Sequence, residues 1–277
     1  MARILAALAV LSCVGCSLQQ PYVTEERLAR GLVIVLPGIE GPSLLNSGIR
    51  RGLADGGVDY ALELYDWTSK WGPLHSLIDE PRNRGQAQEI VDRIAGYRRE
   101  YPRNPVFLVG RSSGAAIAVW VAEALPAGEQ LEGIVLLAAS LSPQYPLAKA
   151  LANSQRGIVS FRSELDVFFL MLGTTTLKAA DRSRGPAAGR AGFRRPPAEG
   201  WPSEYDRLFE IVWTWRMIPT GHLGMHATSG KAGFVSTYVA PLIRSEVWDA
   251  ETVARAANGR SRDHLQLEAG TQPTAGP

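Results

Sequence analysis

Residues 105–114 read PVFLVGRSSG, an apolar run that passes directly into a serine flanked by glycines. The apolar run predicts a buried strand that ends at Gly110. Residues 115–125 are rich in alanine and stop before Pro126, which predicts a helix that ends there. A strand and a helix therefore meet at a turn with the pattern Gly-x-Ser-x-Gly.

This turn indicates a nucleophilic serine. A serine on a sharp strand-to-helix turn needs neighbours without bulk on both sides, and the turn projects its hydroxyl above the sheet edge. Only Ser112 has a glycine two residues away on each side, so it is predicted as the nucleophile rather than Ser113. The following helix directs free N–H groups and its positive dipole end at the same point. The alternative is a serine that merely caps that helix.

The rest of the chain alternates apolar segments with helical ones. Further strands are predicted at residues 31–36, 60–65, 133–138, 157–161 and 213–217, and helices at residues 86–99 and 234–243. Near-continuous apolar strands separated by helices predict a mostly parallel central sheet with helices on both faces. The connection between the fourth and fifth strands is short, so no large cap is expected there.

With this order of elements the chain resembles the α/β-hydrolase superfamily, and more narrowly the exported bacterial serine esterases and lipases. The resemblance covers residues 31–244. It implies an α/β-hydrolase fold and hydrolysis of carboxylic esters through an acyl-enzyme, without a cofactor. It also implies that the backbone N–H groups of Ile39 and Ser113 form the oxyanion hole. Pro37 stands where many relatives have histidine, which is a departure from the family pattern.

The resemblance also orders the remaining catalytic groups as nucleophile, acid and histidine. The acid is therefore expected after the strand that ends at Phe161, where residues 163–166 read SELD. A pattern S-x-x-D in related hydrolases favours Asp166, and Glu164 is the alternative. The acid would hold the histidine tautomer and stabilise the imidazolium. The other interpretation of Asp166 is a helix cap or a solvated charge.

The chain has four histidines, which limits the choice of base. His75 precedes the nucleophile and His264 lies in a polar C-terminal segment, which leaves His222 and His226. They stand in GHLGMH, residues 221–226, a glycine-interrupted loop before a helix. Its similarity to the histidine loop of related hydrolases favours His226, with His222 as the alternative. A metal site is not predicted, because the glycines oppose a helix and no HExxH glutamate or cysteine is available.

The glycine-, proline- and arginine-rich residues 181–204 form an irregular insertion between the predicted acid and base. Two interpretations stay open for it. The insertion covers the mouth of the site, or it is an ordered surface loop without a role in substrate choice.

Composition excludes several classes of protein. The chain has 277 residues, 45% of them hydrophobic, enough for one core but short for two enzyme domains. Its net charge of +2 is too balanced for a nucleic-acid binder. Both cysteines lie within the first 16 residues, which excludes a disulfide-rich scaffold.

The N-terminus has the layout of an export signal, with Arg3 followed by an apolar run that is too short to span a bilayer. A small residue before a cysteine resembles a bacterial lipoprotein signal. Gly15 favours Cys16 as the lipidated residue, and Cys13 is the other candidate. An ordinary secretion signal is the alternative. The expected organisation is a signal peptide (1–16), a tether (17–30), the hydrolase domain (31–245) and a polar, mobile tail (246–277).

The sequence therefore predicts an exported enzyme, anchored by a lipid to a membrane of the cell envelope. Its substrate would be a small-molecule ester with a hydrophobic group, and no nucleic-acid partner is expected. The alternative function is a non-catalytic binding or scaffold protein of the envelope with the same fold, because fold alone does not guarantee activity.

Overall fold

The structure is a computed structural model that describes residues 21–166, 180–181, 185–195 and 202–259. Within these residues six strands form one sheet, in which all neighbouring strands are parallel and the order is β2-β1-β3-β4-β5-β6. The strands are β1 (Leu32–Leu36), β2 (Ala61–Leu64), β3 (Val106–Arg111), β4 (Gly133–Leu137), β5 (Ile158–Arg162) and β6 (Leu208–Val212).

The sixth strand is the one element of the sheet that the sequence misplaces. The predicted strand at residues 213–217 is wrong, because Trp215–Thr220 forms a 3-10 helix that contains Pro219. The strand lies just before it, at the edge of the sheet. This edge strand is only partly buried and carries Glu210 among its apolar residues. Because this strand mixes apolar and charged residues, a search for apolar runs does not find it.

Helices precede, connect and follow the strands. They are α1 (Glu25–Leu28), α2 (Leu44–Asp55), α3 (Pro73–Ile78), α4 (Glu80–Glu100), α5 (Ser113–Ala124), α6 (Ala148–Ala152), α8 (Ala188–Ala191), α9 (Ala232–Phe234), α10 (Ala240–Arg244) and α11 (Ala250–Ala257). A π-helical turn, Val235–Val239, joins α9 to α10. Among the described residues, no helix combines the length and the apolar character needed to cross a bilayer.

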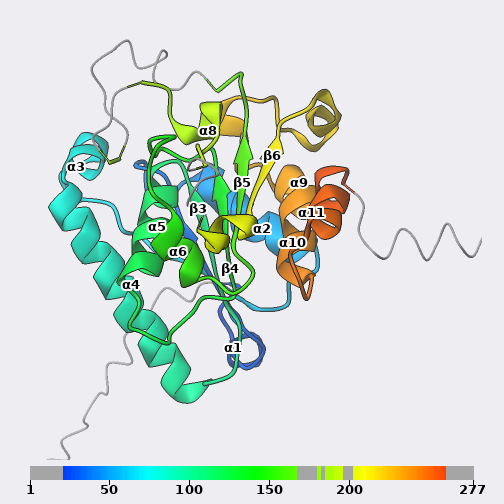
Figure 1. Cartoon of the computed structure of the whole chain (residues 1–277). Helices are drawn as coiled ribbons and strands as arrows, with labels where there is room; N and C mark the ends of the chain where they lie inside the picture. Colours follow the sequence, from blue (N-terminus) through cyan, green and yellow to red (C-terminus); the bar gives the residue numbers. More distant parts are fainter. Residues whose placement is uncertain (1–20, 167–179, 182–184, 196–201, 260–277) are drawn as a thin grey trace, which may run out of the picture.

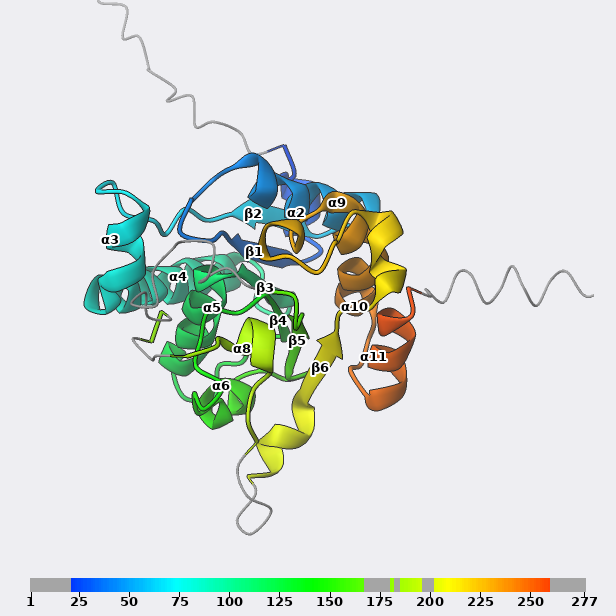
Figure 2. The same cartoon turned by 90° about the horizontal axis from the view of Figure 1, so that it is seen from above.

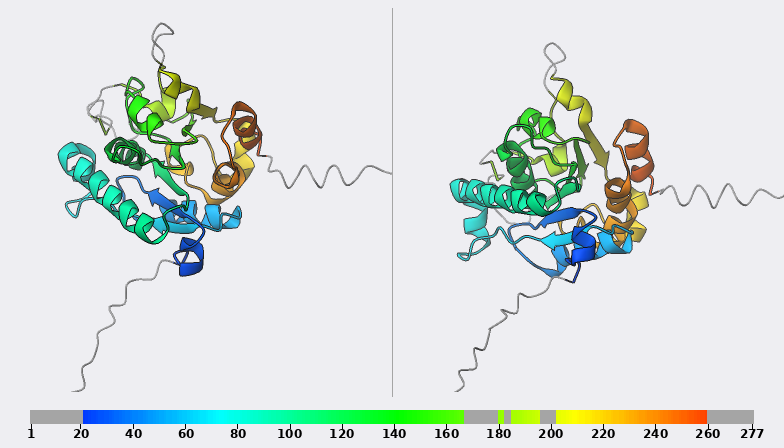
Figure 3. Two further views of the ribbon diagram at one scale, coloured as in Figure 1. Left: turned by 60° about the horizontal axis from the view of Figure 1, so that its bottom comes forward. Right: turned by 90° about the horizontal axis from the view of Figure 1, so that it is seen from below.

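These helices cover both faces of the sheet (Figure 1). The helices α4, α5 and α6 lie on one face, and α2, α9, α10 and α11 lie on the other, as the view from above shows (Figure 2). Two further views show the sheet between the same two layers (Figure 3). Because both faces are covered, every residue of β1, β3 and β4 is buried. The predicted α/β-hydrolase fold, without a large cap between β4 and β5, is confirmed.

Both ends of the described chain belong to the domain, which corrects the predicted tether and tail. At the N-terminal end, Arg27 donates from Nη1 to the carbonyl oxygens of Val58 and Tyr60, at 3.1 and 2.8 Å. At the C-terminal end, Trp248 is 6% exposed and α11 buries one stripe of apolar side chains. Because one face of this amphipathic helix is polar, the sequence predicted a solvated tail here.

Some expectations fall outside the described residues. These are the signal peptide of residues 1–16 with Cys13 and Cys16, the first residues of the tether (17–20), and the tail from residue 260 onward.

The strand order places a topological switch point between β1 and β3. The chain leaves β1 toward β2 and leaves β3 toward β4, in opposite directions along the sheet. Ligands of open α/β sheets bind at such a switch point, outside the carboxyl ends of the strands. The register pairs Leu36 with Gly110, so the loop after β1 and the turn after β3 begin at the same level.

Candidate active site

Ser112 occupies the turn between β3 and α5 in a conformation that few residues other than glycine adopt. Its φ is 55° and its ψ is −122°. Such a backbone costs about 1–3 kcal/mol and persists only where the surroundings enforce it. Here the Ser112 N–H donates to Leu137 O at 2.9 Å, and the Ser140 N–H donates to Ser112 O at 3.1 Å. The end of β4 thus holds the strained turn in place.

The two glycines of the pattern are required by close backbone approach. A Cβ atom at Gly110 would collide with the carbonyl oxygen of Gly114 and the backbone of Ala115. A Cβ atom at Gly114 would collide with the carbonyl oxygens of Leu36 and Pro37. The absence of side chains therefore lets the loop after β1 lie directly against the serine turn.

The structure brings Ser112, Asp166 and His226 together. His226 Nε2 lies 2.8 Å from Ser112 Oγ, and His226 Nδ1 lies 2.8 Å from Asp166 Oδ2. All three side chains are almost completely buried, with exposures of 10% for His226 and 7% for Asp166. With its proton on Nδ1, the imidazole donates to the carboxylate and accepts from the serine hydroxyl.

The acid loop follows β5 and is hydrogen-bonded to α8. Asp166 N–H donates to Ser163 O at 3.0 Å, and Ser163 N–H donates to Gly189 O at 2.9 Å. Gly189 N–H in turn donates to Ala139 O at 2.8 Å, which links α8 to the end of β4. This support comes from within the stretch predicted to be irregular (181–204), and no pattern in the sequence marked it.

Glu164, the alternative acid, points into solvent. Its side chain is 80% exposed, and its charged neighbour is Arg162, with an N–O distance of 3.8 Å. The loop directs Asp166 toward His226 and Glu164 away from it.

The histidine loop depends on two glycines with positive φ, Gly221 at 87° and Gly224 at 79°. They allow the chain to turn twice before the 3-10 helix His226–Thr228. His226 O then accepts a hydrogen bond from Ser229 Oγ at 2.9 Å. The loop therefore presents His226 at the first residue of a short helical turn, above the sheet.

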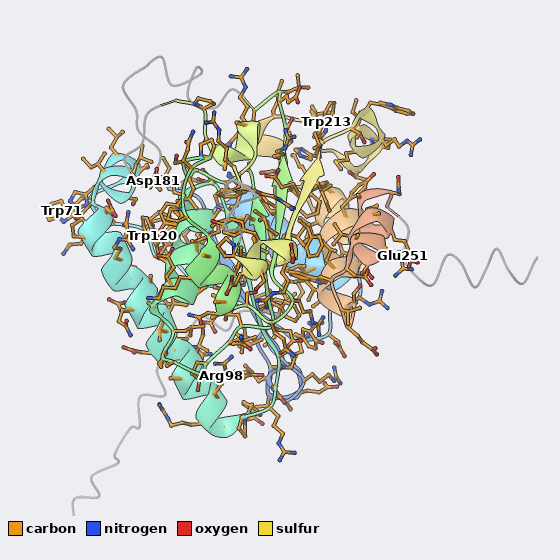
Figure 4. All side chains as sticks on the ribbon, in the orientation of Figure 1. Trp71, Arg98, Trp120, Asp181, Trp213 and Glu251 are labelled. Carbon is orange, nitrogen blue, oxygen red and sulfur yellow. The ribbon has the colours of Figure 1, made fainter. Side chains whose placement is uncertain are left out.

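His222, the alternative base, is a buried structural residue. Its Nδ1 lies 2.9 Å from Thr228 Oγ1, and its ring centroid lies 4.4 Å from that of Phe234. Its carbonyl oxygen accepts from Trp213 Nε1 at 2.9 Å, and Trp213 lies beyond the end of β6 (Figure 4). Burial lowers the pKa of His222 to about 4, although the charge of Asp166 opposes that shift. At neutral pH the ring is uncharged.

The expected oxyanion donors lie on the two segments that meet at the glycines. Ser113 is the first residue of α5, and Ile39 lies in the loop after β1, partly buried against the core. Within the described chain, neither N–H group donates to a backbone carbonyl outside the helices and strands. The loop that carries Ile39 is held by Trp67, whose Nε1 donates to Pro37 O at 2.8 Å.

One charged pair beside the site was not found by sequence reasoning. Arg111, the residue before the nucleophile, is 2% exposed, and its Nη2 lies 2.5 Å from Glu40 Oε1. Burial lowers the pKa of Arg111, and the charges of Glu40 and Asp166 act in the opposite direction. A Gly-x-Ser-x-Gly pattern leaves this position open, so only the fold reveals the pair. Among the described residues, no three histidine, cysteine or acidic side chains cluster as a metal site would require.

No family model and no curated protein matches the chain in sequence. Among solved structures, a thermostable carboxyl esterase from Bacillus coagulans is 23% identical over 44% of this chain and 39% of its own length, with a TM-score of 0.31. TT1662 from Thermus thermophilus is 16% identical, over 78% of this chain and 90% of its own, with a TM-score of 0.46. Lipase B from Aspergillus fumigatus is 11% identical, over 88% of this chain and 62% of its own, with a TM-score of 0.49.

The chain thus spans about two fifths of the Bacillus coagulans esterase with which it aligns. At these identities and scores, the similarities carry no argument about activity. The molecule itself has six parallel strands in one sheet and a strained serine at the end of β3. By that architecture the chain has an α/β-hydrolase fold.

Proposed function

We propose that this protein is a serine hydrolase that cleaves carboxylic esters through Ser112, His226 and Asp166. The observation that carries the proposal is the pair of 2.8 Å contacts made by His226, one to each of the other two side chains. A serine hydroxyl becomes nucleophilic when a neighbouring base accepts its proton and a third group orients that base. The positive φ of Ser112 supports the same role, because nucleophile turns are strained in this way.

In the proposed reaction, Ser112 Oγ attacks the ester carbonyl carbon while His226 Nε2 takes the hydroxyl proton. The N–H groups of Ile39 and Ser113 bind the negative carbonyl oxygen, and each contributes about 3 kcal/mol in the transition state. His226 then donates the proton to the leaving alcohol oxygen, and the acyl group stays on Ser112. Water, activated by His226, cleaves this acyl-enzyme. Asp166 stays ionised and stabilises the imidazolium.

Exposed apolar side chains beside the acid and the base support an ester with a hydrophobic group. Leu165 precedes Asp166 and is 51% exposed, and Met225 precedes His226 and is 54% exposed. Leu223, in the same loop, is 47% exposed. Burying such surface against an acyl or alcohol chain contributes about 25 cal/mol per Å². These residues therefore favour a substrate with an apolar chain.

A fluorophosphonate probe tests the catalytic proposal, because it phosphonylates only an activated serine. We expect the wild-type protein to be labelled at Ser112, as located by peptide mass spectrometry, and Ser112→Ala to be unlabelled. His226→Ala should lower the labelling rate and ester turnover by about 10³-fold or more. His222→Ala is the matched control, since the ring of His222 contacts Thr228 and Phe234. Its folded fraction should keep most of the activity.

Two outcomes would contradict the proposal. A folded wild-type protein that takes up no probe would favour the non-catalytic envelope protein. Equal losses in His222→Ala and His226→Ala, at equal folded fractions, would remove the special role of His226.

We also propose that the mature chain begins at a lipidated Cys16 and lies at a membrane of the cell envelope. The support is the sequence before Cys16, with its basic, apolar and small residues in order. In a bacterial host, Cys16→Ser should move the protein from the membrane fraction to the soluble fraction and abolish incorporation of labelled fatty acid. Cys13→Ser should change neither. The reverse result would assign the lipid to Cys13.

A further inference from the structure

An ion pair between the buried Arg111 and Glu40, whose side chain is 32% exposed, joins the serine turn to the loop that carries Ile39. Arg111 Nη2 lies 2.5 Å from Glu40 Oε1, and the Arg111 side chain is 3% exposed. Asn46, which is fully buried in α2, donates from Nδ2 to the same carboxylate oxygen at 3.1 Å and to Gly41 O at 2.8 Å. The pair therefore connects the residue before the nucleophile with the residue after the expected oxyanion donor.

The carboxylate of Glu40 lies against the backbone of this loop. A Cβ atom placed at Gly38 would collide with Glu40 Oε2. Glu40 is thus folded back over the segment of residues 38–40, whose Ile39 N–H is one of the two proposed oxyanion donors. An uncompensated negative charge at this place would oppose the negative oxygen that forms in the transition state.

The environment of Arg111 makes its charge costly. Its Nε and Nη1 atoms are buried and have no hydrogen-bond partner among the described residues. Transfer of a charge from water to such a place is unfavourable, and solvent weakens the attraction of Glu40, whose side chain is partly exposed. The stability of the fold therefore gives no reason for an arginine here. The neighbouring carboxylates, Glu40 in contact and Asp166 near by, give an electrostatic reason.

We propose that Arg111 is a positioning residue of the oxyanion hole. It cancels the charge of Glu40 and ties the loop of residues 37–41 to the serine turn, so that the Ile39 and Ser113 N–H groups meet at one oxygen. This inference rests on the proposed function, because it concerns the oxyanion of the same reaction. Arg111 acts through Glu40 and touches no substrate atom.

A double-mutant cycle tests the inference. The variants are Arg111→Met, Glu40→Gln and their combination, and each is compared with the wild type in kcat, KM and the inhibition constant of a trifluoromethyl ketone. This inhibitor forms a tetrahedral adduct with an activated serine, and the adduct carries a negative oxygen in the oxyanion hole. The ketone therefore reports on that hole directly, whereas KM reports on binding of the neutral ester.

We expect Arg111→Met to lower kcat and weaken the ketone by about 10- to 100-fold, less than the roughly 100- to 1,000-fold loss on deleting an oxyanion donor. KM should stay within about 3-fold, because the neutral ester is bound as before. In the Glu40→Gln background the same substitution should cost less than about 5-fold, since the carboxylate that Arg111 contacts is no longer charged. Rescue of this kind is not expected from an arginine that only fills space.

Two further variants keep the test decisive. Arg111→Lys retains the charge and should keep kcat within about 10-fold, even if Arg111→Met does not fold. Arg156→Met removes a comparable pair with Glu132, whose N–O distance is 2.6 Å, just before β4 and β5 at the opposite end of the sheet. It should lower stability and leave the kcat and ketone affinity of the folded protein unchanged.

Each result decides the inference. Equal losses for Arg111→Met with and without Glu40→Gln, or a loss in KM rather than kcat, would overturn it. A loss of more than about 10-fold in Arg111→Lys would overturn the role of the charge. If wild-type protein reacts with the fluorophosphonate and Arg111→Met keeps its kcat, only this inference falls. If the wild type does not react, the proposed function falls and this inference with it.

Discussion

Two histidines four residues apart show how strongly position in the fold decides what a side chain does. His226 reaches both Ser112 and Asp166 with its ring nitrogens, at 2.8 Å each. His222 turns its ring toward Thr228 and Phe234 instead. Gly224 lies between them, and its positive φ allows the chain to turn there. One ring lies between a hydroxyl and a carboxylate, and the other is kept neutral by burial.

The low pKa of His222 has a consequence for stability. Its pKa is about 4 in the folded protein and about 6.5 in an unfolded chain. Between these values the unfolded chain binds a proton that the native protein does not, so the stability present above pH 6.5 is lost as the pH falls toward 4. We expect a slope of up to about 1.4 kcal/mol per pH unit from this residue.

Urea unfolding of wild type and His222→Gln at a series of pH values between 8 and 4 measures that slope. His222→Gln should lower the free energy of unfolding at pH 7. Below pH 6.5 its free energy of unfolding should fall less steeply than that of the wild type, because about one proton fewer is taken up on unfolding. Parallel curves for the two proteins would contradict the neutral, buried state of His222.

At the scale of elements, the site is made by the close approach of the β1 loop to the start of α5. α5 is buried along most of its length, where it packs against β3, β4 and α4. Its first turn can touch the carbonyl oxygens of Leu36 and Pro37 only because residue 114 is glycine. Gly110 allows the same turn to close on the strand before it.

Alanine should have opposite effects on stability at two glycines, one in this contact and one in open space. Gly114→Ala would force the loop after β1 away from the helix, and we expect a loss of stability on the order of 3 kcal/mol together with loss of probe labelling. Gly85 lies exposed in α4 with no atom within 4 Å of an added Cβ, so Gly85→Ala should stabilise the protein by about 0.5–1 kcal/mol. Urea unfolding and labelling of both variants would test this. Normal labelling of Gly114→Ala would contradict the tight fit.

At the scale of the whole molecule, the end of the described chain completes the second face of the sheet. Trp248 lies between α10 and α11, and its ring centroid is 6.2 Å from that of Phe107 in β3. A Cβ atom at Gly133, the first residue of β4, would collide with the same ring. Trp248 Nε1 donates to Leu242 O at 2.8 Å. The ring thus joins the C-terminal helices to the middle of the sheet.

Removal of this ring should therefore act on the fold rather than on the chemistry. We expect Trp248→Ala to lower the free energy of unfolding by about 3–5 kcal/mol, with the turnover of the remaining folded protein unchanged. Trp71 is the matched control, because it is 74% exposed at the edge of the molecule (Figure 4). Trp71→Ala should change stability by less than about 0.5 kcal/mol. Equal effects of the two substitutions would show that the C-terminal helices add little to the core.

The sequence by itself determined the parts of this protein that depend on near neighbours in the chain. The apolar run before Gly110 and the alanine-rich run after Gly114 specify a strand, a turn and a helix, because each of these forms through contacts a few residues apart. The parallel sheet followed from the same kind of pattern, repeated along the chain. The short amphipathic α11 and the edge strand β6 were not predicted, since their buried faces are narrow and interrupted by polar residues.

Only the tertiary structure decided which of the candidate side chains meet. Asp166 and Glu164 stand two residues apart in one loop. The pattern of related hydrolases favoured Asp166, but only the folded chain shows that Asp166 faces His226 and Glu164 faces solvent. The support from α8 and the pairing of Arg111 with Glu40 join segments that are distant in the chain. Such contacts depend on how the strands are ordered in the sheet, and local patterns carry no information about that order.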